Sequence, residues 1–199
     1  MTHRVIDILA RHDVRSTFFV LGQKLADPAA RDVAERAHAA GHWVGNHSFT
    51  HKTPLGRMRD AAESVAEISR TQEAMGALAH PRRFFRPFGG GGALGPHLLS
   101  RAAFDHLCAE QYTCVLWNAI PRDWEGDRNW VQRAIDLCAG QDWTLIVLHD
   151  LPTGAMQYLH EFLCRLEDNG FDIEQDFPPE CLIVRNGVPD RDAEKYISG

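Results

Sequence analysis

The most informative segment of this sequence is Gly45-Asn46-His47-Ser48-Phe49-Thr50-His51. It places two histidines four residues apart, and two neutral imidazoles held together can bind a divalent metal such as zinc, which activates water for hydrolysis. A second pair with this spacing, His38 and His42, shows that spacing alone is a weak signal. Context separates the pairs. His38 lies near the end of an expected helix, whereas His47 and His51 follow a short apolar run where a strand gives way to a loop, the usual location of ligand-binding groups in α/β folds.

Around this segment, periodic helical patterns alternate with short apolar runs, which is typical of an α/β layered or barrel fold. The patterns predict helices over residues 2–12, 28–40, 60–78, 96–108, 129–139 and 154–168. They predict strands over residues 16–20, 44–46, 83–86, 113–117, 144–148 and 181–184. Several of these runs are apolar on both faces, which favours a mostly parallel sheet covered by helices.

The clearest helix signals surround residues 28–40. Asp27 can cap the exposed amides, Pro28 suits the first helical position, and Gly41 suits a left-handed stop. By contrast, the helical pattern over residues 2–12 leads straight into the first apolar strand. The chain therefore begins on a helix, where an α/β barrel normally begins on a strand.

Composition indicates one globular domain over residues 1–199. The chain is 44% apolar and 24% charged, with a formal charge of −6 and a pI near 6.0. The chain has no Lys/Arg-rich stretch of the kind that binds nucleic acid. It also has no apolar window long enough to span a membrane, and its N-terminus does not resemble a signal peptide. We therefore expect a cytoplasmic protein that binds neither nucleic acid nor membrane.

The cysteines indicate buried thiols rather than disulfides or zinc ligands. They are odd in number and widely spaced, and they form no Cys-x2-Cys pair. The five are Cys108, Cys114, Cys138, Cys164 and Cys181.

Polar groups also collect at three other places where strands should end. Arg86 follows two aromatic residues and precedes a glycine-rich turn, whose backbone amides can hold an oxyanion. Asp123 lies beside Trp124, soon after an apolar strand. His149 follows an apolar run that we expect to be a buried strand, and a histidine there can act as acid or base near neutral pH. Each place also has an ordinary interpretation: a solvated arginine loop, a surface turn and a core histidine.

In their order and spacing these motifs resemble the polysaccharide deacetylase family, also called the NodB-homology domain or carbohydrate esterase family 4. The resemblance extends from about residue 2 to about residue 187, and its motifs are residues 17–22, 41–51, 86–89, 123–124 and 148–150. It implies a distorted (β/α) barrel and removal of an acetyl group from an N-acetylated sugar.

The resemblance also implies roles for the matching polar residues. His47 and His51 would bind zinc or a related divalent metal. His149 would be the general acid and Asp123 its electrostatic partner. Arg86 would orient the active-site carboxylates.

For substrate binding, a backbone amide at Phe88 or Gly89 would face the oxyanion. Leu148 and Trp124 would shape the acetyl pocket. The arginine motif is one residue shorter than the family's commoner form and has Phe88 in place of tyrosine.

The largest departure from the family is at the beginning of the chain. The family begins on a strand ending in Thr-Phe-Asp-Asp-Gly, whose aspartates supply the third metal ligand and the base, and this sequence lacks it. Asp7 and Asp13 fall within or just after the first helix and are not candidates. We therefore expect a fold incomplete at the N-terminus and weak or no activity, because Met1 is an internal methionine or because the chain is a degenerate homologue.

Two alternatives to a hydrolase of N-acetylated saccharides or other small amides remain open. One is a non-catalytic sugar-binding or regulatory domain that retains the barrel. The other takes the glycine run at residues 89–92 as a phosphate cradle, although no P-loop Lys-Ser/Thr follows it. A barrel lacking one strand would expose apolar surface and a sheet edge, which favours a homo-oligomer.

Overall fold

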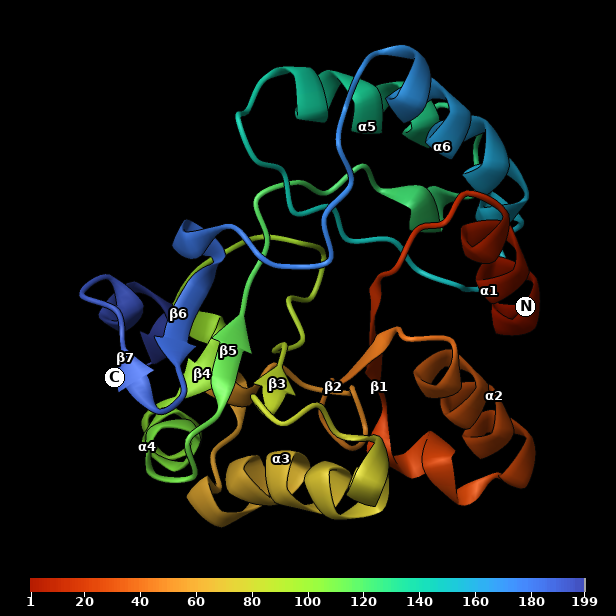
Figure 1. The fold of residues 1–199 in the computed structure, drawn as a ribbon. Helices are drawn as coiled ribbons and strands as arrows, with labels where there is room; N and C mark the ends of the chain where they lie inside the picture. Colours follow the sequence, from red (N-terminus) through yellow and green to blue (C-terminus); the bar gives the residue numbers. More distant parts are fainter. Residues whose placement is uncertain (199) are drawn as a thin grey trace. The chain divides into compact units, whose positions relative to one another are not determined.

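The computed structural model describes residues 1–198 as short strands and helices (Figure 1). The chain divides into two compact units, each built from two separate segments of sequence. The first unit combines Met1–Ser16 with Trp117–Cys181, and the second combines Thr17–Leu116 with the segment that begins at Leu182.

The second unit is organised by a six-stranded sheet in the order β1-β2-β3-β5-β6-β7. Four of these strands run parallel: β1 (Thr17–Val20), β2 (Trp43–Asn46), β3 (Phe84–Phe85) and β5 (Thr113–Val115). Side chains in the middle of the sheet, including those of Phe84, Phe85 and Cys114, are fully buried. Burial of each of the two phenylalanine side chains contributes about 1.5–3 kcal/mol to folding.

The sheet is mostly parallel, as expected, and its last two strands are the exception. β6 (Leu182–Arg185) and β7 (Val188–Pro189) run antiparallel to β5 and to each other. Asn186 and Gly187 join them, with φ angles of 47° and 83°. This Asn-Gly pair suits a two-residue hairpin, and such a hairpin can join only antiparallel strands.

Three α-helices belong to the second unit: α2 (Pro28–Ala39), α3 (Ala61–Met75) and α4 (Arg101–Ala109). The predicted cap of α2 is confirmed, because the Asp27 carboxylate accepts a hydrogen bond from the Ala29 amide at 2.9 Å. The helix expected over residues 96–108 begins later than predicted. A 3-10 turn (Pro96–Leu98) and the short strand β4 (Leu99–Ser100) precede α4, and the Ser100 hydroxyl caps it. β4 pairs with β8 (Ile197–Ser198).

The first unit contains α1 (Thr2–Arg11), α5 (Trp130–Ala139) and α6 (Leu159–Asp168). α1 buries one apolar stripe, formed by Val5, Ile6, Ile8 and Leu9, and packs against α6. The helix expected over residues 154–168 is a 3-10 turn (Ala155–Tyr158) followed by α6. Within the part of the chain that the structure describes, no helix is both long and apolar enough to cross a bilayer.

The buried strand expected over residues 144–148 is wrong. Pairing here is a single parallel bridge between Ala119 and Ile146, and the run is half-buried rather than buried. The Asn118 side chain accepts from the Leu145 amide at 2.7 Å, so a side chain replaces a ladder partner. Apolar and β-branched composition favours extended backbone, but a strand also requires a partner along its length.

All five cysteines are free thiols. Cys114, Cys138 and Cys181 are buried, whereas Cys108 and Cys164 are only half-buried. Burial raises the pKa of the Cys114 thiol well above its ordinary value. The expectation of buried thiols therefore holds for three of the five.

Candidate functional site

The loop that follows β2 holds two imidazoles side by side. The ring centroids of His47 and His51 are 4.7 Å apart, with an angle of 54° between the ring planes. Ser48 and His51 adopt left-handed backbone conformations, with φ angles of 66° and 56°. Such conformations are unfavourable for residues other than glycine and persist only where surrounding contacts impose them.

Contacts from α3 impose this loop conformation. One carboxylate oxygen of Glu67 accepts hydrogen bonds from the amides of Phe49 and Thr50, at 3.0 and 2.8 Å. Asn46 accepts from the Ser48 amide at 3.0 Å and donates to the Ile68 carbonyl at 2.9 Å. The Glu67 side chain is almost fully buried, so these charge-assisted bonds are shielded from water.

The His47 ring has one defined tautomer. Its Nδ1 lies 2.7 Å from the backbone carbonyl oxygen of Arg86. A carbonyl oxygen can only accept, so Nδ1 carries the proton and the lone pair is on Nε2. This is the arrangement by which proteins orient a metal-binding histidine.

Arg86 itself is buried at the end of β3. Its guanidinium donates to the carbonyl oxygens of Val115 and Leu116, both at 3.3 Å. It also lies over the Phe19 ring, 4.2 Å from the ring centroid. These contacts connect three strands of the sheet, β1, β3 and β5.

The glycine-rich turn begins beside the second imidazole. The Phe88 ring lies 3.9 Å from the His51 ring, centroid to centroid. The Gly89 carbonyl accepts from the His97 ring at 3.0 Å, which fixes the entry into the turn. Gly90 has a φ of 57° and Gly91 one of 104°, conformations that favour glycine.

In the first unit, Asp123 holds His149 by two hydrogen bonds. One carboxylate oxygen accepts from the His149 amide at 2.6 Å, and the other lies 3.0 Å from its Nδ1. The Asp123 side chain is fully buried and that of His149 is about one-third exposed, at 32%. Nδ1 therefore carries a proton towards the carboxylate, and Nε2 is the nitrogen available for proton transfer.

The two remaining predicted residues of this unit flank the histidine. The Trp124 ring meets the His149 ring edge to face, with centroids 5.3 Å apart. Leu148 directly precedes His149 and is half-buried. Arg122 has a left-handed φ of 61°, immediately before the 3-10 turn Asp123–Glu125 that presents both the carboxylate and the indole.

Sequence reasoning missed two residues that shape these groups, Glu67 and His97. Glu67 has a recognisable signal, because it shares a helical face with Ser64, Ile68 and Thr71, all of which are buried. An acidic residue on the buried face of a helix requires a polar partner. His97 has no comparable signal, since it lies in a single 3-10 turn (Pro96–Leu98) without a repeating pattern.

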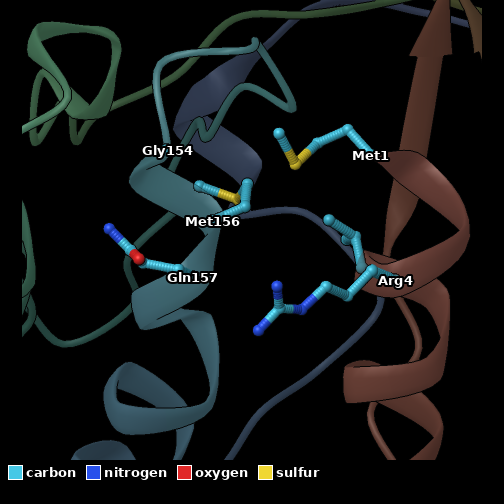
Figure 2. Close-up of a pocket in the computed structure, with 6 residues that line it drawn as sticks. Met1, Arg4, Gly154, Met156 and Gln157 are labelled. Carbon is cyan, nitrogen blue, oxygen red and sulfur yellow. The ribbon is translucent and has the colours of Figure 1, made fainter.

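A small cavity opens between the start of α1 and the 3-10 turn before α6 (Figure 2). Its volume is about 150 Å³, and its walls are Met1, Arg4, Val5, Gly154, Met156 and Gln157. None of the predicted site residues lines it. Sites for organic ligands usually measure about 300–1,000 Å³, so this cavity is too small for a saccharide.

Comparison with known proteins identifies the family. Residues 1–96 match the family model described as polysaccharide deacetylase. The chitooligosaccharide deacetylase of Rhizobium leguminosarum bv. trifolii is 34% identical over 157 residues, which cover 75% of this chain and 65% of that protein. The chain belongs to the polysaccharide deacetylase family. It spans about two thirds of the length of this curated relative, 65%.

Solved structures of polysaccharide deacetylase type share the fold. A family 4 carbohydrate esterase from Streptomyces lividans superposes with a TM-score of 0.72 at 24% identity, covering 95% of this chain and 91% of that one. A CE4 family pseudoenzyme from Bacillus anthracis gives a TM-score of 0.72 at 20% identity, covering 86% and 57%. The expected α/β class, a distorted (β/α) barrel of the polysaccharide deacetylase type, is confirmed.

Proposed function

We propose that this protein is a metal-dependent amide hydrolase that removes the acetyl group from an N-acetylated saccharide. Family membership and the similarity to a chitooligosaccharide deacetylase support this reaction. The observation that carries the proposal is the pair of adjacent imidazoles in the loop after β2, in which the Arg86 carbonyl fixes the His47 tautomer.

The imidazole pair fits a divalent metal such as zinc. His47 directs the Nε2 lone pair away from the Arg86 carbonyl, and the His51 ring lies beside it. When bound, such a metal polarises the amide carbonyl and lowers the pKa of water. Catalytic zinc usually has three protein ligands, and the family's paired aspartates are absent from this sequence. We therefore propose weak metal affinity and weak or no activity for the chain as it stands.

In this proposal His149 supplies the proton for the leaving amine. Asp123 accepts from the Nδ1–H of the ring and holds the ring in place, so Nε2 delivers the proton. A positioned general acid typically contributes about 10²–10⁴ in rate. Trp124 packs against the ring and restricts its rotation.

The groups proposed for substrate binding are Phe88 and Gly89 in the second unit and Trp124 and Leu148 in the first. An amide at Phe88 or Gly89 would donate to the oxyanion, and the indole and the leucine would contact the acetyl methyl group. Arg86 would orient carboxylates, a role that its buried guanidinium suits.

Acetate release from N-acetylated chitooligosaccharides, measured with and without added Zn²⁺, tests the proposal. We expect slow, zinc-stimulated release that His47→Ala and His149→Ala each reduce by about 10²-fold or more. His38→Ala is the matched control, because His38 belongs to the other pair with the same spacing and is exposed on α2. Release that His47→Ala leaves unchanged would contradict the proposal.

The second candidate function is a non-catalytic saccharide-binding or regulatory domain. A metal site of two imidazoles favours it, because catalytic zinc usually has three protein ligands and its water needs a general base. Calorimetric titration with a chitooligosaccharide distinguishes the two. Tight binding without acetate release, even at saturating zinc, would favour the binding domain.

A further inference from the structure

A different cluster of metal-ligating side chains lies in the first unit, where the end of α1 meets α6. His12 Nε2 lies 2.7 Å from His160 Nδ1, and Cys164 Sγ lies 3.8 Å from both ring nitrogens of His160. One ligand atom from each of the three residues lies within 4.8 Å of the other two. We propose that His12, His160 and Cys164 bind Zn²⁺ or a similarly soft divalent cation, separately from the imidazole pair of His47 and His51.

The fold places these ligands by two independent means. His160 and Cys164 are four residues apart on α6, so their side chains lie on one face of the helix. His12 is the C-cap residue of α1, which packs against α6. The two rings are already in contact, with centroids 4.9 Å apart. A bound cation would therefore link the two helices.

The distances are close to those of a tetrahedral zinc site. Ordinary Zn–N and Zn–S bond lengths place two nitrogen ligands about 3.3 Å apart, and a nitrogen and a sulfur about 3.6 Å apart. The sulfur-to-nitrogen distance of 3.8 Å agrees with this geometry. The nitrogen-to-nitrogen distance of 2.7 Å is that of a hydrogen bond, so the rings must separate slightly to admit the cation.

Ligation also requires a defined movement of protons. One ring nitrogen in the contact between His12 and His160 carries a proton, and that ring must keep its proton on the other nitrogen when the cation binds. The Cys164 thiol loses its proton to solvent as the sulfur–metal bond forms. His160 is exposed, so water can carry these protons away and can occupy the fourth position on the cation.

The donor set determines the class of cation. A thiolate with two imidazoles favours zinc and related soft ions over magnesium or calcium, which prefer oxygen ligands. Sequence reasoning expected no cysteine to be a zinc ligand, because no Cys-x2-Cys pair is present. A ligand set whose members lie 148 positions apart in the sequence has no such spacing signal.

Titration of the full chain with Co²⁺, a spectroscopic substitute for zinc, tests the site without any enzyme assay. We expect a thiolate-to-cobalt charge-transfer band that Zn²⁺ abolishes by displacement. Cys164→Ser should remove the band. Cys108→Ser, which changes another half-buried thiol, should keep it. A band that survives Cys164→Ser, or its absence from the unsubstituted protein, would overturn the proposal.

Thermal unfolding gives a second measurement that does not depend on the thiol. Zn²⁺ in about 100-fold excess over the dissociation constant should raise the Tm by about 5 °C or more, because it binds only the folded state. His12→Gln should lose most of this shift, whereas the paired substitution His47→Ala, His51→Ala should keep it. The opposite result would assign the stabilisation to the loop after β2 and contradict the proposal. Because neither measurement uses acetate release, failure of the proposed function leaves this test intact.

Discussion

Asp123 acts on His149 through its backbone and its ring at the same time. Its two carboxylate oxygens each accept one hydrogen bond from the histidine, and the carboxylate is completely buried. One aspartate therefore fixes where the histidine lies and which of its nitrogens carries the proton. A buried carboxylate with fewer partners would be strongly destabilising.

Asp123→Asn should separate these two roles. An asparagine side chain has a single acceptor oxygen, so one of the two donors of His149 loses its partner. We expect a loss of about 1–3 kcal/mol in the free energy of unfolding, measured by denaturant titration. The exposed Asp142→Asn is the control and should change stability by less than about 0.5 kcal/mol. Equal effects of the two substitutions would contradict this account.

Glu67 lies in α3 and supports the loop that carries His47 and His51, although it is not itself a metal ligand. Glu67→Gln keeps the shape but removes the charge from the two hydrogen bonds to Phe49 and Thr50. We expect zinc affinity at the His47 and His51 pair to fall by about 10–100-fold, as for other groups that orient metal ligands. Isothermal titration calorimetry in the Cys164→Ser background measures this. Glu63→Gln, on the exposed face of the same helix, should have no effect, and a matching loss there would refute the proposed support.

These residues also show what a sequence reveals about a site. The spacing of His47 and His51 is local and visible, and so is the adjacent Asp123-Trp124 pair. The bond from Arg86 to His47 joins residues 39 positions apart, and the bond from Asp123 to His149 joins residues 26 apart. The family resemblance implies the pairing of Asp123 with His149, which their separation in the sequence does not indicate. Nothing in the residue pattern indicated the tautomer-fixing carbonyl, because any residue can supply a backbone oxygen.

At the scale of elements, β2 packs closely on its neighbours just before the loop that carries His47 and His51. Gly45 lies in β2 opposite Phe19 of β1. A Cβ at this position would lie 2.6 Å from the Phe19 ring and 3.3 Å from Phe84. Glycine is therefore required at this position by space and not by backbone conformation.

Gly45→Ala should consequently disturb both the strand and the loop that follows it. We expect a loss of about 1–3 kcal/mol in stability from overpacking, together with weaker zinc binding at His47 and His51. Gly140→Ala is the matched control, because an added Cβ there meets nothing closer than 3.6 Å. If chemical denaturation showed Gly45→Ala to be as stable as the control, the tight packing of β2 would be disproved.

Element boundaries followed local chemistry where caps were present. Asp27 and Pro28 predicted the beginning of α2 correctly, whereas the cap of α4 at Ser100 was hidden behind a proline that also suits a helix start. Residues 144–148 have strand composition but only one bridge partner. The composition of a segment predicts which backbone conformation it prefers. It does not predict whether another strand lies beside that segment to pair with it.

At the scale of the whole molecule, the division into two units follows from contacts between distant segments. Each unit combines one segment from the first or last part of the chain with a longer segment from elsewhere. Local periodicity carries no information about such long-range contacts. The single domain over residues 1–199 stays a prediction, and the α/β class is confirmed by the solved structures of the family.

The two units should differ in local stability, and hydrogen exchange measured by mass spectrometry can detect this. Residues 145–148 of the first unit are half-buried and held by one bridge, whereas β2 of the second unit is paired on both sides and largely buried. We expect the amides of residues 145–148 to exchange at least about tenfold faster than those of β2, because fewer contacts must open. Equal protection of the two segments would contradict this expectation.

The interleaving of segments also determines when the protein can fold during its synthesis. α1 leaves the ribosome well before α6, against which it packs, because α6 begins only at Leu159. In the second unit, β5 likewise lacks its antiparallel partner until β6 has been synthesised. Nascent chains emerge at about 5–20 residues per second, so the apolar face of α1 stays uncovered for several seconds and is a natural binding site for chaperones.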